Sequence, residues 1–143
     1  MRRRDALVLA LAASLPAAAR AGERPFVEHR LALQLSDATA EKQALVLSVA
    51  AAVLKAYGPD RVALEVVAFG PGIALLRTDN PHRTLVESLM AQEVVFDACL
   101  NTVETIERES GAPFPLHPGA RRVAWGVPHL LSLAEQGFTL VRP

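Results

Sequence analysis

The 143-residue chain contains one cysteine, Cys99, and few aromatic residues, which make up 5% of it. A lone cysteine cannot form a disulfide within its own chain. It also excludes the two-thiol cycle of a C-x-x-C oxidoreductase, which needs a second thiol to release a mixed disulfide. No surplus of charge is present, because 15 basic residues balance 15 acidic ones. With no basic cluster beyond Arg121-Arg122 in residues 22–143, we do not expect nucleic acid as a partner.

Motifs that mark common cofactor and metal sites are also missing. The loop Gly70-Pro71-Gly72 lacks the third glycine of G-x-G-x-x-G, because Leu75 stands in its place. The chain has no G-x-x-x-x-G-K-[ST] phosphate loop. Its histidines make no metal-binding pair at i, i+4 spacing; they are His29, His82, His117 and His129. We therefore expect no cofactor and no bound metal.

The first 21 residues have the organisation of a secretory signal peptide. Arg2-Arg3-Arg4 form a positive start, residues 6–19 are mostly Ala, Leu and Val, and Ala19 and Ala21 are small residues at the two positions that a signal peptidase reads. We expect cleavage before Gly22 and a periplasmic or secreted product. A membrane anchor is the alternative, but the apolar run is shorter than the ~20 residues of a span. The twin-arginine and general secretion routes both stay open.

Residues 22–143 predict one domain. They contain 11 basic and 14 acidic residues, a net charge of −3, with no repeat and no linker. A segment of this length can bury one hydrophobic core. No long apolar run remains after cleavage, so we expect no stable membrane span.

Apolar runs and helical patterns alternate along this domain. Strands are expected at residues 31–35, 62–69, 94–98, 121–125 and 138–141. Helices are expected from Ala40 to Gly58, from Pro81, from Asn101 to Gly111 and from about Pro128 to Gly137. Strands that alternate with helices across short connections require right-handed crossovers. We therefore predict a flavodoxin-like, three-layer α/β/α domain with a mostly parallel five-stranded sheet.

Local signals predict how some elements begin. Residues 36–39 offer several side-chain caps for the first helix, Asp37 among them. Asn101 and Glu104 resemble a capping box at the start of the third helix. The glycines of Gly70-Pro71-Gly72 indicate a sharp turn after the second strand.

The first helix has no clear polar face. Between residues 44 and 54 the only polar side chain is Ser48. A helix that is apolar all round is expected to be buried on more than one side, and one small domain covers only one. Residues 50–52, all alanine, are either neutral surface or part of a subunit interface; we favour the interface.

Three segments follow the carboxyl ends of predicted strands, where α/β proteins bind ligands: residues 36–37, 70–72 and 99–102. Among them Cys99 has the most distinctive chemistry. It precedes a helix N-terminus, whose positive potential would stabilise a thiolate. The alternative is a buried cysteine that acts as a small hydrophobe. Asp97 and Cys99 share a strand face, but a neighbouring carboxylate opposes thiol ionisation.

Two nearby residues have ordinary interpretations that we prefer. Asp97 is expected to be a hydrogen-bonded or exposed residue at the strand end. His129 could approach Cys99 across the strand ends, but an exposed or core-edge position is the favoured interpretation.

The sequence resembles the DsrE/DsrF-like proteins over residues 29–143. The motifs that carry this resemblance are A-C-L-N-T at 98–102, F-G-P-G-I at 69–73, P-G at 118–119, G-V at 126–127 and Q-G-F at 136–138. The resemblance implies a parallel five-stranded sheet and assembly into homotrimers or homohexamers. It also implies that Cys99 carries sulfur as a persulfide, as in the sulfur-relay members. Those members are cytoplasmic, whereas we expect this chain to be exported.

We therefore expect an exported sulfur-handling protein with sulfurtransferase-like chemistry. Cys99 would take sulfur from a small donor and pass it to a thiol-bearing acceptor protein. The pocket would be formed by Asn101, Thr102, Gly70 and Gly72, with Asp37 capping a neighbouring helix. Two alternatives stay open. One is a non-enzymatic oligomeric scaffold with a structural Cys99, and the other is a peroxide-sensing single thiol.

Overall fold

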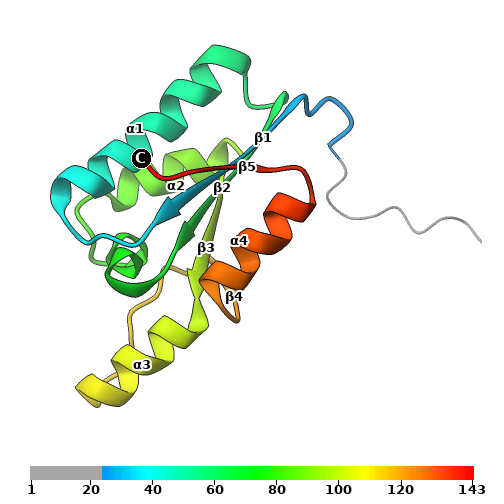
Figure 1. Ribbon diagram of the computed structural model, residues 1–143. Helices are drawn as coiled ribbons and strands as arrows, with labels where there is room; N and C mark the ends of the chain where they lie inside the picture. Colours follow the sequence, from blue (N-terminus) through cyan, green and yellow to red (C-terminus); the bar gives the residue numbers. More distant parts are fainter. Residues whose placement is uncertain (1–23) are drawn as a thin grey trace, which may run out of the picture.

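A five-stranded, all-parallel sheet forms the centre of the protein (Figure 1). The computed structural model describes residues 24–143, so the expected signal peptide at 1–21 lies outside the described residues. The strand order is β4-β3-β2-β1-β5. The strands are β1 (His29–Leu35), β2 (Val62–Ala68), β3 (Val95–Cys99), β4 (Arg121–Val123) and β5 (Thr139–Val141). The predicted parallel α/β sheet is thus confirmed.

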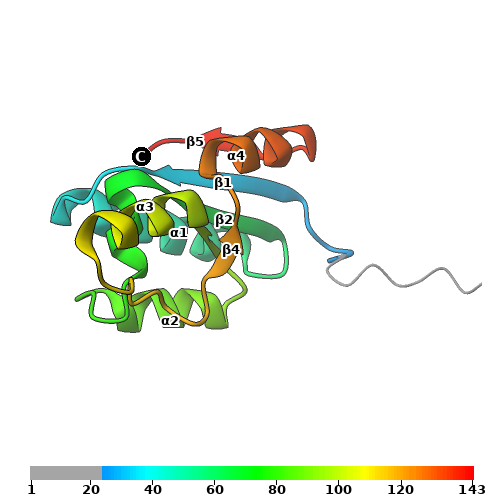
Figure 2. The same ribbon diagram turned by 90° about the horizontal axis from the view of Figure 1, so that it is seen from below.

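Helices cover both faces of this sheet. The helices are α1 (Ala40–Tyr57), α2 (Arg83–Ala91), α3 (Leu100–Ser110) and α4 (Gly126–Glu135), with a 3₁₀ helix η1 (Gly70–Leu76) after β2. Helices α1 and α2 pack on one face, whereas α4 alone crosses the other, from the β4 edge to the β5 edge (Figure 2). Helix α3 continues beyond the end of β3 (Figure 1).

Burial follows this layering. Strand β2 lies at the centre of the sheet and is almost wholly apolar, as expected for a parallel strand covered on both faces. The larger core lies under α1 and α2 and includes Leu33, Leu47 and Phe96, each at most 1% exposed. A smaller core of Ala32, Val67, Leu130, Leu133 and Phe138 lies under α4. Across residues 24–143, no helix has both the length and the apolarity to span a bilayer.

Helix α1 buries one face in this chain. Its buried apolar residues are Val46, Leu47, Ala50 and Leu54. The opposite face carries Ala44, Ser48, Ala51 and Ala52 in exposed positions, together with Leu45, which is 42% exposed. Alanine dominates this outer face, which explains how the helix lacks a polar stripe without a large apolar patch.

The start of α1 differs from the prediction that Asp37 caps a helix. Thr39 is the N-cap residue, and its hydroxyl oxygen accepts a hydrogen bond from the Lys42 N–H. Asp37 instead pairs with Arg142 at 3.3 Å. Because an N-cap side chain reaches the N–H two or three residues later, Asp37 lies too early in the chain to cap a helix that begins at Ala40.

The start of α3 shows that a second prediction, the capping box of Asn101 and Glu104, is wrong. Helix α3 begins at Leu100, and its N-cap is Cys99, which makes no side-chain capping bond. Asn101 therefore lies inside the first turn and cannot form a capping box with Glu104. The reason is that β3 continues directly into α3, with no loop in which a capping residue could stand.

Three further boundaries differ from the expected ones. Gly70-Pro71-Gly72 opens the 3₁₀ helix η1 and is not a simple turn. Helix α2 begins at Arg83, two residues after Pro81, and β4 ends at Val123 because α4 starts as early as Gly126. These differences leave the order of the elements unchanged.

Candidate functional site

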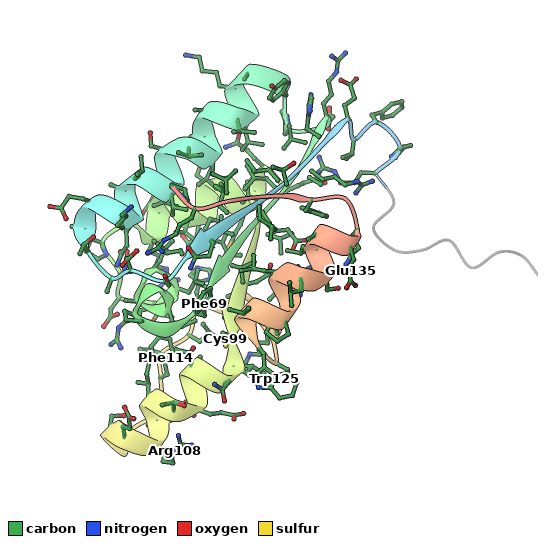
Figure 3. All side chains as sticks on the ribbon, viewed as in Figure 1. Phe69, Cys99, Arg108, Phe114, Trp125 and Glu135 are labelled. Atoms are coloured by element: carbon green, nitrogen blue, oxygen red, sulfur yellow. The ribbon has the colours of Figure 1, made fainter. Side chains whose placement is uncertain are left out.

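Cys99 lies at the carboxyl edge of the sheet, where β3 ends and α3 begins. Its thiol is free and the residue is 4% exposed. The sulfur accepts a hydrogen bond from the backbone N–H of Gly126, with an N-to-Sγ distance of 3.3 Å. Figure 3 places Cys99 between Phe69 and Trp125, at the junction of β3, α3 and the first turn of α4.

The helix that donates to the sulfur was not the expected one. We predicted that the amides of the helix after Cys99 would hold the sulfur, but the bond comes from Gly126 at the start of α4. Cys99 follows Asp97 by two residues, so both side chains point to the sheet face that α4 covers. The first turn of α4 is therefore the element nearest to the sulfur.

Close packing fixes the position of the Gly126 amide. A Cβ atom added to Gly126 would lie 2.9 Å from Cβ of Phe69, closer than real Cβ contacts. The absence of a side chain thus allows the first turn of α4 to approach Phe69 and Cys99. Trp125, the N-cap of α4, is 60% exposed beside them.

Three of the predicted site residues line a pocket of about 400 Å³, and two of them follow Cys99 closely in the sequence. It is lined by Gly70, Pro71, Asn101, Thr102, Thr105 and Ile106. The Thr102 hydroxyl oxygen accepts a hydrogen bond from the Gly70 N–H at 2.9 Å, which joins η1 to α3. Gly72 does not line this pocket, because it packs against the backbone of Leu35. Asp37 does not line it either.

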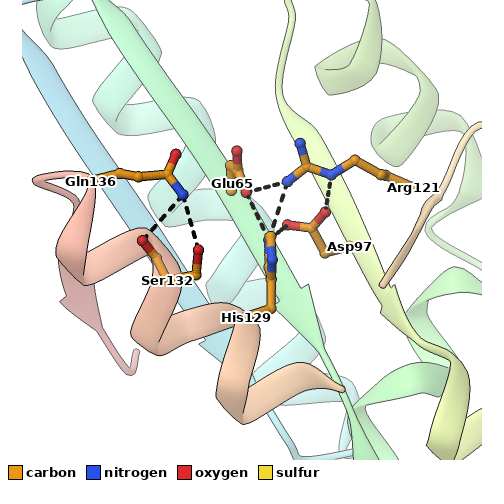
Figure 4. Close-up of polar contacts among 6 residues, drawn as sticks. All are labelled: Glu65, Asp97, Arg121, His129, Ser132 and Gln136. Atoms are coloured by element: carbon orange, nitrogen blue, oxygen red, sulfur yellow. Dashed lines mark hydrogen bonds and ion pairs between the residues drawn. The ribbon is translucent and has the colours of Figure 1, made fainter. Parts of the chain in front are cut away.

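A polar cluster lies between the sheet and α4, on the same face as Cys99 (Figure 4). It consists of Glu65 from β2, Asp97 from β3, Arg121 from β4 and His129 from α4. Arg121 donates from Nε to Oδ1 of Asp97 at 2.5 Å and from Nη2 to Oε2 of Glu65. Nε2 of His129 lies 3.3 Å from Oε2 of Glu65 and 3.2 Å from Oδ2 of Asp97.

This cluster places two acids in a region almost closed to solvent. The Asp97 side chain is 0% exposed and that of Glu65 is 11% exposed. Burial raises the pKa of Glu65 from 4.5 to about 7, with further contributions from the hydrogen bond and charge of Asp97, while Arg121 and His129 act in the opposite direction. Glu65 therefore exchanges its proton near neutral pH.

The sequence interpretation did not identify the cluster. Asp97 was expected at a strand end with an ordinary role, and His129 at the core edge; the structure brings them together with Glu65 and Arg121. One signal was available, since Glu65 is the only charged residue of β2. A charge in a central parallel strand must find a partner inside the protein.

Comparisons with known proteins bear on the fold. No family model and no curated protein matches this chain. Among solved structures it is similar to the protein of unknown function MTH1491 from Methanobacterium thermoautotrophicum. The TM-score is 0.72 with 28% sequence identity, and the match covers 81% of this chain and 100% of that chain. This likeness supports the α/β fold observed here.

Proposed function

We propose that this protein carries sulfane sulfur on Cys99 as a persulfide. The observation that supports this most directly is the hydrogen bond from the Gly126 N–H to the Cys99 sulfur. A backbone N–H at the first residue of a helix stabilises an anion, and Cys99 itself stands at the N-cap of α3. A thiolate or perthiolate at this position would be held by the Gly126 amide at the N-terminus of α4.

The reaction needs no oxidant or reductant beyond the sulfur donor. The Cys99 thiolate attacks the outer sulfur of thiosulfate, the S–S bond of the donor breaks, and sulfite leaves with the electron pair. Cys99 then holds the added sulfur as a perthiolate. After protonation, an acceptor thiolate attacks the outer sulfur of the persulfide, and Cys99 leaves as a thiolate. One cysteine is sufficient for both steps.

The burial of Cys99 restricts the donor to small molecules. At 4% exposure the sulfur is not open to a bulky disulfide, and Cys99 itself does not line the pocket at Gly70, Asn101 and Thr102, so a small donor would have to pass from this pocket to the sulfur. In the proposed function this pocket receives the anionic donor. We place the protein in the periplasm or outside the cell, after removal of residues 1–21.

Intact mass measures sulfur loading on Cys99. The mature protein is purified without reductant, incubated with thiosulfate or polysulfide and weighed. We expect the mass of one sulfur atom or more to be added, and none in Cys99→Ser. Unchanged loading of Cys99→Ser, or no loading of the wild type, contradicts the proposal. Thr84→Ser, at an exposed position of α2 outside this pocket, is the matched control and should load as the wild type does.

A second candidate is a non-enzymatic oligomeric scaffold in which Cys99 only packs. The 4% exposure of the residue favours it. Iodoacetamide labelling separates the two functions. A persulfide carrier should react in the folded state, whereas a structural thiol should react only when the protein unfolds.

We also propose that the chain forms a homotrimer or homohexamer through α4 and β5. Trp125, Val127 and Leu131 are 60%, 51% and 60% exposed on or beside α4, which is the helix that covers this face within residues 24–143. Val127 and Leu131 are four residues apart and so lie on one side of α4. Leu140 and Val141 of β5 add exposed apolar surface nearby. An apolar surface of this kind marks a protein interface in a soluble domain.

Light scattering after size-exclusion chromatography tests the assembly. We expect Leu131→Glu to yield a monomer, because a charge would be buried in the interface. Leu45→Glu on the outer face of α1 is the control and should leave the assembly intact. The reverse result would place the interface on α1, and a wild-type monomer at all concentrations would contradict the proposal.

A further inference from the structure

Three side chains of the polar cluster direct metal-ligating atoms at one point. Oε2 of Glu65, Oδ2 of Asp97 and Nε2 of His129 all lie within 4.8 Å of one another. The nitrogen is 3.3 Å and 3.2 Å from the two oxygens. A tetrahedral zinc ion with bonds of about 2.0–2.1 Å separates its ligand atoms by about 3.3 Å. Octahedral sites with the same bonds bring neighbouring ligands to about 2.9 Å.

The ring nitrogen Nε2 of His129 cannot satisfy all the contacts that it makes in the cluster. Oδ2 of Asp97 is fully buried and has no hydrogen-bond partner among residues 24–143, although Nε2 of His129 is close. Nε2 also lies 3.2 Å from Nη2 of Arg121, which can only donate. A single ring nitrogen cannot accept from the arginine and donate to two carboxylates at once. A cation at the centre would bond to all three atoms.

We propose that Glu65, Asp97 and His129 bind a zinc ion between the sheet and α4, in exchange for the Arg121 guanidinium. When both carboxyl groups are ionised, they neutralise a divalent ion, whereas Arg121 leaves one negative charge over. The Arg121 side chain is 45% exposed and extends from an edge strand, so it can turn into solvent without disturbing the core. Asp97 and Glu65, in contrast, are held inside the sheet.

Solvent reaches the Glu65 side of the proposed site. Glu65 and Arg121 line an open pocket of about 550 Å³ at the side of the sheet, together with Arg30 and Gln136. Three protein ligands leave the fourth position of the ion open, which is the arrangement of catalytic zinc sites. This position would accept a water molecule or a small anion. The site uses no atom of Cys99 and does not depend on sulfur transfer.

Metal binding is tested on the mature protein after removal of metals with EDTA. Zinc affinity is measured by competition with a coloured chelator, and cobalt is added as a spectroscopic substitute. We expect one zinc per chain and the visible absorption of tetrahedral cobalt. His129→Gln and Asp97→Asn each remove a ligand and should weaken binding by about 100-fold or more. Arg121→Gln removes the competing cation and should strengthen it by about tenfold.

Two control variants separate this site from other zinc ligands. His82→Gln changes a histidine outside the cluster, and Cys99→Ser removes the thiol; both should bind zinc as the wild type does. Circular dichroism identifies any variant that fails to fold, and His129→Gln, at a side chain 20% exposed, is the one least at risk. Unchanged binding in folded His129→Gln, lost binding in Cys99→Ser, or weaker binding in Arg121→Gln would each overturn the proposal.

Discussion

Replacement of Gly72 by alanine should lower the free energy of unfolding by about 3 kcal/mol, at the upper end of the usual cost of overpacking. A Cβ atom at this position would lie 2.3 Å from the carbonyl oxygen of Leu35 and 2.6 Å from its carbonyl carbon. These are backbone atoms at the end of β1 and cannot turn aside as a side chain would. The first turn of η1 must therefore move away from the sheet. Urea denaturation measures the change.

Gly111→Ala provides the matched control for this substitution. Gly111 ends α3 with a φ of 70°, and a Cβ atom there would have no neighbour within 4 Å. Alanine at this position is disfavoured only by the left-handed backbone conformation, which should lower the free energy of unfolding by roughly 1–2 kcal/mol. If Gly72→Ala were no more destabilising than Gly111→Ala, close packing between η1 and β1 would not be the cause.

The sequence was sufficient to predict the strands, because buried parallel strands are short apolar runs bounded by glycine and proline. The run at 62–69 became Val62–Ala68, and the run at 94–98 became Val95–Cys99. The position of β5 beside β1 was beyond local reasoning. It depends on α4 crossing the whole sheet, and no pattern within residues 126–141 fixes that path.

Helix starts were predicted less well, because several residues near a boundary can serve as caps. Asn101 and Glu104 have capping-box spacing, yet the helix already begins at Leu100. Side-chain caps contribute about 1 kcal/mol. The burial of β3 and its direct continuation into α3 outweigh the contribution of a side-chain cap. Tertiary packing therefore determines where α3 begins.

Some residues of the candidate site could be predicted from the sequence, and others depend on tertiary packing. Gly70, Asn101 and Thr102 could be placed near one another because each follows the end of a strand in one parallel sheet. The Gly126 amide could not, since α4 reaches Cys99 only through the crossover. The polar cluster was hidden for a related reason. Its four members come from β2, β3, β4 and α4, and the register that places Asp97 beside Arg121 is a property of the folded sheet.

Metal-free protein should lose stability as the pH rises from about 5 to about 7. The pKa of Glu65 is raised from 4.5 to about 7 in the folded state, chiefly by burial. The folded state therefore keeps a proton that the unfolded state releases. Stability from this group is complete below pH 4.5 and is lost as the pH passes through about 7. One proton gives a slope of at most about 1.4 kcal/mol per pH unit. Urea midpoints in EDTA measure it.

The groups that face Glu65 determine which control is informative. Asp97, Arg121 and His129 surround its carboxyl group, and the imidazole is a second group there that can hold a proton. Glu65→Gln keeps an oxygen that can accept from Arg121 but does not titrate, so its stability should vary less with pH and exceed that of the wild type at about pH 8.

Two further variants decide between the carboxyl group and the imidazole as the proton carrier. Glu87 is exposed, and its pKa is lowered, first by the hydrogen bond from Arg83. Glu87→Gln should therefore lose stability between about pH 5 and 7 as the wild type does. His129→Gln removes the imidazole and should also retain the loss if Glu65 holds the proton. A flat profile in His129→Gln, with the wild-type slope kept in Glu65→Gln, would assign the proton to the histidine. The two carboxylates would then be ionised together, held by Arg121 and by the protonated imidazole of His129.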